Sequence, residues 1–141
     1  MNDQERYAQG MEVRRAVLGD GHVNRAVERT TDFTAPFQDL ITRYAWGEVW
    51  SRPGLDPASR SMITLALLTA LGQEHELATH VSAALRNGLS TEQIREVLLH
   101  SAVYAGIPAA NRAFAVAQRV FDDAGPAAGS EPSESVPPGV K

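Results

Sequence analysis

Apolar residues recur at three- and four-residue intervals along most of this chain, and no segment shows the sustained period-two alternation of a strand. In the range 36–46, for example, Phe37, Leu40, Ile41 and Tyr44 follow one another at helical spacing. The pattern therefore predicts an all-α fold, a compact domain of about six helices, over residues 4–18, 36–46, 57–71, 74–87, 91–105 and 109–123. A further short helix fits residues 22–29.

Residues typical of helix ends mark several of these boundaries. Asp56 followed by Pro57 predicts an N-cap with proline at the first helical position. Ser90, with Gln93 three residues later, predicts a capping box. The aromatic segment 47–54 contains Pro and Gly, so we expect it to form a turn.

The segment 62–71 is apolar nearly all round. A helix of this kind is either the buried centre of a fold or is covered by another subunit. A small domain has little surface with which to cover such a helix. We therefore expect a homo-oligomer.

The composition excludes several classes of function. The net charge is -4, which gives no electrostatic footprint for nucleic acid, and no Lys/Arg-rich run suits an anionic membrane. The longest uncharged apolar stretch, 61–73, is shorter than the ~20 residues that a bilayer requires.

The chain has no cysteine, so thiol catalysis and disulfides are excluded. A polar N-terminus without an apolar signal segment and the lack of cysteine both fit a cytoplasmic location.

The 141 residues are enough for one domain. We expect this helical domain to comprise residues 1–124. Residues 125–141 are rich in Gly, Pro, Ser and Glu, which predicts a disordered tail.

The pair Glu76 and His80 is the clearest candidate for chemistry. Residues four apart lie one turn from each other on a helix, and with Ala83 and Asn87 they form a stripe at the edge of the apolar face. A carboxylate that orients an imidazole suits general acid–base work. The alternative is a surface ion pair worth ~0.3–0.5 kcal/mol. The second histidine of a zinc-type HExxH motif would have to stand at Thr79, so we expect no metal.

Trp46 and Trp50, the two tryptophans of the chain, flank a segment that leads to Arg52. Large aromatic side chains beside a cation can form a pocket for a small planar anion. The alternative is that both indoles pack as ordinary core or interface residues.

Two segments together resemble the 4-carboxymuconolactone decarboxylase family. They are WGEVWSRPGL at 46–55 and YAGIPAA at 104–110, and the similarity extends over about residues 4–123. Further matching positions are Arg14, Val17-Leu18-Gly19, His22-Val23, Phe37-Gln38, Arg60-Ser61, Glu76-Leu77, His80 and Asn87-Gly88. The wider superfamily includes alkylhydroperoxidase D, but this chain has Gln73 and Glu76 where that protein has its redox cysteines.

The resemblance implies an alkylhydroperoxidase D-like fold, a hexamer, and a carbon–carbon lyase of protocatechuate catabolism. That reaction decarboxylates 4-carboxymuconolactone to 3-oxoadipate enol-lactone without a cofactor, because the lactone itself accepts the electron pair. Two alternatives stay open. One is a related enzyme that acts on another unsaturated lactone or a β-keto acid, and the other is a non-catalytic helical subunit.

The resemblance also implies roles for individual residues. His80 is expected to be the acid or the donor to the oxyanion, and Glu76 is expected to orient it. Substrate-binding roles are expected for five further residues. Arg14 and Arg52 are expected to hold the carboxylates of the substrate. Trp46 and Trp50 are expected to exclude water, and His22 is expected to assist.

Overall fold

The computed structural model describes residues 1–125 and contains seven α-helices and one π-helix within them, with no strand in that range. The all-α prediction is therefore confirmed for the described part of the chain. The helices are α1 (Asp3–Leu18), α2 (Asp20–Arg29), α3 (Ala35–Ile41), η1 (Thr42–Trp50), α4 (Pro57–Leu71), α5 (Glu74–Arg86), α6 (Thr91–Ala105) and α7 (Ile107–Ala124). The predicted tail lies outside the described residues, apart from Gly125.

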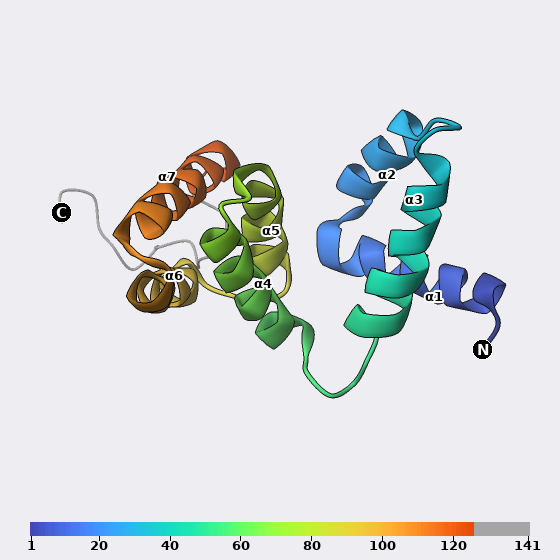
Figure 1. Ribbon diagram of the computed structural model, residues 1–141, viewed down its shortest axis with the longest axis horizontal. Coiled ribbons are helices and arrows are strands. Elements are labelled where there is room, and N and C mark those ends of the chain that lie inside the picture. Colours follow the sequence, from blue (N-terminus) through green and yellow to red (C-terminus); the bar gives the residue numbers. More distant parts are fainter. Residues whose placement is uncertain (126–141) are drawn as a thin grey trace.

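The helices form two groups that are joined by the segment 51–56 (Figure 1). One group contains α1, α2, α3 and η1, and the other contains α4 to α7. Helices α1 and α5 make the main contact between the groups. None of the helices in residues 1–125 combines the length and the hydrophobicity needed to span a bilayer.

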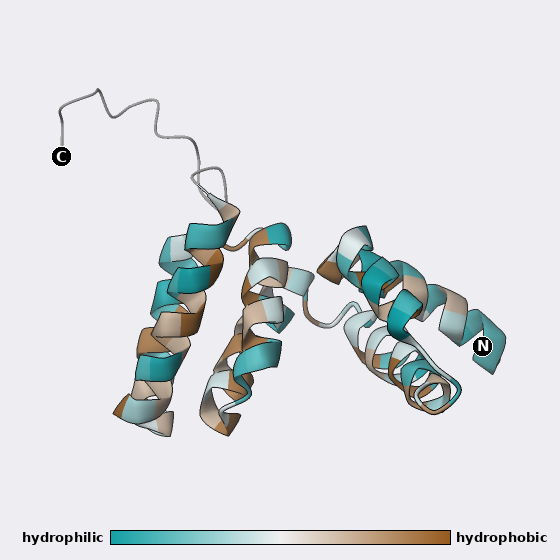
Figure 2. Ribbon diagram, turned by 90° about the horizontal axis from the view of Figure 1, so that it is seen from above, coloured by the Kyte–Doolittle hydropathy of each residue, from teal (hydrophilic) through white to brown (hydrophobic). Residues whose placement is uncertain are grey.

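The principal core lies inside the second group. Hydrophilic and hydrophobic residues alternate along the helices (Figure 2), and the apolar sides of α4 to α7 pack together. The fully buried residues at its centre include Leu65, Leu77, Val81, Ile94 and Leu98. A smaller cluster of Val17, Trp46 and Ala83 lies between the two groups and joins them.

The capping predictions are confirmed. The Asp56 side chain accepts a hydrogen bond from the backbone N–H of Ser59 at 2.7 Å. Ser90 and Gln93 form the complete capping box, with bonds of 3.0 and 2.9 Å. Such caps satisfy N–H groups that would otherwise lack partners at the helix start.

Helix α4 is not the buried centre of the chain, so that alternative was wrong for a single copy. Only Ser61, Leu65 and Thr69 are buried on it. Ile63, Leu67 and Leu71 are 47%, 55% and 69% exposed. The reason is that α5, α6 and α7 cover only one side of α4, and the opposite side has no cover within residues 1–125.

The predicted turn over 47–54 was also wrong in its first half. The helix continues as η1 to Trp50, and the turn begins at Ser51. Gly47 serves close helix packing rather than a turn, because its Cα faces the backbone of α1. A Cβ at Gly47 would lie 2.5 Å from the carbonyl oxygen of Arg6.

Candidate active site

Two indole rings lie side by side on the π-helix η1. The centroids of Trp46 and Trp50 are 5.2 Å apart, and the rings are tilted by 31°. Trp46 is 6% exposed and belongs to the cluster between the two helix groups, while Trp50 packs against that cluster. Long π-helical stretches are rare and occur frequently at functional sites. The indoles therefore form one wall at the junction of the groups.

Two glycines set the position of this wall. A Cβ at Gly10 of α1 would lie 2.0 Å from the carbonyl oxygen of Thr42, and a Cβ at Gly47 would also be too close to the backbone of α1. No side chain fits between the two backbones at these points. Helix α1 therefore holds η1, and with it both indoles, at a distance that only glycine allows.

His80 of α5 stacks on this wall. Its ring centroid lies 6.5 Å from that of each indole, with interplanar angles of 9° to Trp46 and 23° to Trp50. The Nδ1 atom of His80 is buried without a hydrogen-bond partner in the described structure. Nε2 is then the nitrogen of the ring that is left to meet a ligand.

The surroundings of His80 disfavour the charged form of its ring. Burial lowers the pKa of His80 below its ordinary value, and the nearby His22 lowers it further, while Glu76 partly opposes the change. Glu76 itself is exposed. Neither an ion pair nor a hydrogen bond joins Glu76 to His80 among the described residues, so Glu76 acts on the ring through space.

Arg14 is a buried cation with no acidic partner among the described residues. It is 6% exposed. Nη1 donates to Thr42 Oγ1 at 3.2 Å and Nη2 donates to Gln38 Oε1 at 3.1 Å, while Nε is buried without a partner. Burial lowers the pKa of Arg14. A buried charge without a counter-ion is costly, which makes Arg14 suited to an anionic ligand.

His22 of α2 lies close to His80, although the two belong to different helix groups. Burial lowers the pKa of His22, and the charges of Arg14, Arg25, Arg29 and His75 lower it further. His22 thus interacts electrostatically with both His80 and Arg14, and His80 stacks on the indole pair. His22, His80, Arg14 and the two indoles were all predicted as site residues. The α2 arginines and His75, which act on the pKa of His22, were not predicted.

Arg52 is not brought into this group. Its side chain is 65% exposed, and Nη1 lies 3.7 Å from Glu48 Oε2. Its carbonyl oxygen accepts a hydrogen bond of 3.2 Å from Arg60. The structure thus places Arg52 on the exposed side of the segment that follows η1.

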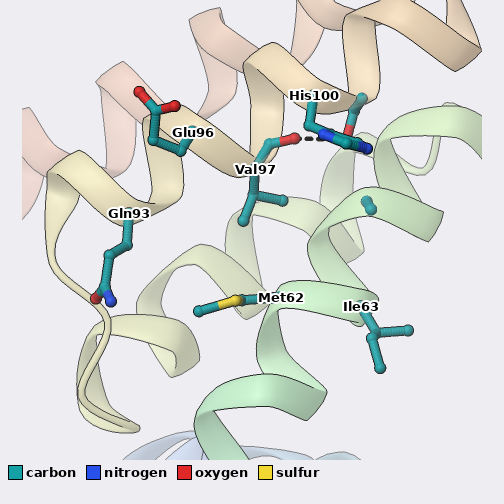
Figure 3. Close-up of a pocket in the computed structure, with 8 residues that line it drawn as sticks. Met62, Ile63, Gln93, Glu96, Val97 and His100 are labelled. Carbon is teal, nitrogen blue, oxygen red and sulfur yellow. Dashed lines mark hydrogen bonds between the residues drawn. The ribbon is translucent and has the colours of Figure 1, made fainter.

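An apolar hollow of about 420 Å³ lies between α4 and α6 and contains none of the predicted site residues (Figure 3). Its lining includes Met62, Ile63, Val97 and His100, and the Val97 carbonyl accepts a hydrogen bond from Ser101 Oγ at 2.8 Å. The His100 ring lies 5.4 Å from that of Tyr104. Among the described residues, no group of three or more His, Asp or Glu is placed to hold a metal ion.

The sequence did not reveal the two glycine contacts or the π-helix. Gly10 and Gly47 lie 37 positions apart, and Gly47 falls in the segment predicted as a turn, so their contact is visible only in three dimensions. The one available signal was a glycine inside a helical pattern, which often has a packing reason.

Comparison with known proteins adds independent information. Residues 35–119 match the model of the carboxymuconolactone decarboxylase family. The chain is 52% identical to 4-carboxymuconolactone decarboxylase of Acinetobacter baylyi over 125 residues, which are 89% of this chain and 93% of that protein. It is also 44% identical to nitrosuccinic acid decarboxylase of Metarhizium robertsii, over 83% of this chain and 82% of that protein.

Proposed function

This chain belongs to the carboxymuconolactone decarboxylase family, and we propose that it converts 4-carboxymuconolactone to 3-oxoadipate enol-lactone in protocatechuate catabolism. The observation that carries the proposal is the half-buried His80 stacked on two indoles, with its Nδ1 buried and without a hydrogen-bond partner in the described structure. The identity of 52% to a decarboxylase of that name supports the choice of substrate.

The chemistry requires no cofactor. The bond between the ring carbon and the departing carboxylate breaks, and its electron pair moves through the adjacent double bond into the lactone carbonyl. The substrate thus accepts the electrons itself, a task that a cofactor performs in many decarboxylases. The protein must stabilise the oxygen of the resulting dienolate and allow a proton to reach the α-carbon.

In this scheme His80 donates its Nε2–H to the dienolate oxygen. A neutral imidazole has one N–H, and the lack of a partner at the buried Nδ1 favours placing that proton on Nε2. The role of oxyanion donor is therefore better supported than that of an imidazolium acid. Glu76 orients the ring through its charge. The α-carbon takes its proton from solvent after carbon dioxide has left, and the half-buried His22 is proposed to assist.

Trp46 and Trp50 keep water from the departing carboxylate. A carboxylate is lost more readily in a dry site, where its charge is poorly solvated. Arg14 and Arg52 are proposed to bind the carboxylates of the substrate. The burial of Arg14 without an acidic partner supports its role, whereas Arg52 is exposed and lies near Glu48.

We also propose a cytoplasmic homo-oligomer, specifically a hexamer. The uncovered side of α4 continues onto α6 and the start of α7, where Leu99, Val103, Tyr104 and Ile107 are 49% to 82% exposed. Monomeric proteins rarely expose large contiguous apolar patches, so further copies of the chain are the proposed cover.

The test is direct conversion of the lactone. Purified protein is mixed with 4-carboxymuconolactone, with no added cofactor and with a chelator present, and both ultraviolet absorbance and released carbon dioxide are followed. Turnover of this lactone supports the proposal. Turnover of other unsaturated lactones, β-keto acids or nitrosuccinic acid alone would instead favour a related decarboxylase, and no turnover of any would favour a non-catalytic subunit.

A further inference from the structure

A cleft of about 590 Å³ lies between α2, α5 and the end of α7, and it includes His22 but none of the other residues assigned above. Helix α2 contributes His22 and Arg25 to its lining, and α5 contributes Thr79, Ser82 and Arg86. The volume is within the usual range for a small-molecule site. Thr79 of the lining directly precedes His80 on α5, and His22 lines the cleft as well, so the cleft adjoins the candidate active site.

Two guanidinium groups lie over the first turn of α2 at this cleft. Nη1 of Arg25 lies 3.4 Å from the position of a Cβ on Gly21. The guanidinium carbon of Arg86 lies 3.2 Å from the corresponding position on Gly19. Both guanidinium groups belong to exposed arginines that lie against the start of α2, the helix that carries His22.

Two arginines and two aspartates line this cleft, and the pairing of one aspartate with a third arginine leaves one positive charge in excess. Asp20 lines the cleft, but Arg15 already pairs with it at 3.1 Å. Asp123 is the other carboxylate in the lining. Among the described residues, Arg25 and Arg86 form no ion pair with either. The cleft thus has a surplus of positive charge and the hydroxyl groups of Thr79 and Ser82, which together suit a carboxylate.

We propose that this cleft binds the carboxylate that the substrate retains, with Arg25 as the principal cation. The inference rests on the proposed function and replaces Arg52 in that role. The departing carboxylate belongs against the indoles, whose dry surroundings favour its loss, so the cation of this cleft is assigned to the other carboxylate. The retained carboxylate keeps its charge throughout and gains from a cation in both the ground state and the transition state.

The experiment compares Arg25→Gln with Arg95→Gln, which removes an exposed arginine on α6. Arg25→Gln should raise KM for the lactone about 10-fold or more with kcat nearly unchanged, because the contact is equally strong before and during reaction. Arg95→Gln should change neither, and Arg25→Lys should recover part of the affinity. Thermal melting of all variants checks that they fold.

A binding measurement separates this inference from the proposed function. Calorimetric titration with succinate, a dicarboxylate, and butyrate, its monocarboxylate counterpart, should show that the wild type prefers succinate and that Arg25→Gln loses this preference. If the wild type does not turn over the lactone but succinate binding depends on Arg25, the proposed function fails and the cleft stands. If the lactone is turned over and Arg25→Gln leaves both KM and succinate binding unchanged, the cleft inference alone is overturned.

Discussion

The contact between α1 and η1 makes Gly10→Ala an informative change. The added methyl carbon would stand 2.0 Å from the carbonyl oxygen of Thr42 and 2.9 Å from the backbone nitrogen of Gly47. Ordinary contacts between such atoms are 3.4 Å or longer. The obstacle is backbone rather than the end of a flexible side chain, so α1 and η1 must separate by more than an ångström.

The cost of such overpacking is about 1–3 kcal/mol in well-packed sites, and the near absence of room here places Gly10→Ala at or above the upper end. The free energy of unfolding should fall by about 3 kcal/mol, less the ~0.5–1 kcal/mol that alanine contributes over glycine in a helix. The melting temperature should drop by roughly 5–10 °C for a chain of this size. Activity should fall as well, because the displaced η1 holds both indoles.

Gly54→Ala is the matched control. Nothing lies within 4 Å of a Cβ at Gly54. Its unfolding free energy in urea should equal that of the wild type or exceed it slightly. If Gly10→Ala were as stable and as active as Gly54→Ala, the close approach of α1 to η1 would not be what positions the indoles.

Three further predictions concern pH, the indole wall and assembly. Because the pKa of His80 is lowered, kcat/KM should stay level as the pH rises from about 6.5 to about 8.5, whereas an imidazolium acid would lose about tenfold per pH unit above its pKa. Because the pKa of His80 is lower in the folded chain than in the unfolded one, the unfolded chain binds more protons below pH about 6.5. The free energy of unfolding, measured in urea, should therefore decrease as the pH falls through that value. Trp50→Ala should lower kcat more than it raises KM in steady-state assays, because it admits water to the departing carboxylate; a pure KM effect would contradict that role. Light scattering at micromolar concentration should give the mass of at least three chains, and a mass of one chain would refute the oligomer.

Much of the fold could be predicted because the helical pattern and the caps are local. The spacing of Phe37, Leu40 and Ile41 indicates a helix from residues only a few positions apart. The caps at Asp56 and Ser90 mark where two helices begin, and they too involve only neighbouring residues. The continuation of the helix to Trp50 could not be predicted in this way. It depends on Gly47 meeting α1, which is a contact between distant parts of the chain.

The candidate site was predictable in part for the same reason. The stripe of Glu76 and His80 follows from helical geometry alone, and its place beside Trp46 and Trp50 is now visible. The family resemblance implied a site role for His22, but the chain order gave no sign that Arg25 would act on it. Their position depends on how α2 folds back after Gly19 and on the packing of α1 against α5.

The most direct test of the central claim is the turnover of 4-carboxymuconolactone by His80→Ala, compared with His100→Ala, which removes an exposed histidine on α6. His80→Ala should lower kcat by ~10²–10⁴, with binding little changed, because the N–H of His80 meets charge that develops in the transition state. His80→Gln, which keeps an N–H donor, should recover part of the loss, and His100→Ala should match the wild type. A folded His80→Ala protein that binds the lactone and turns it over at the wild-type rate would contradict the account.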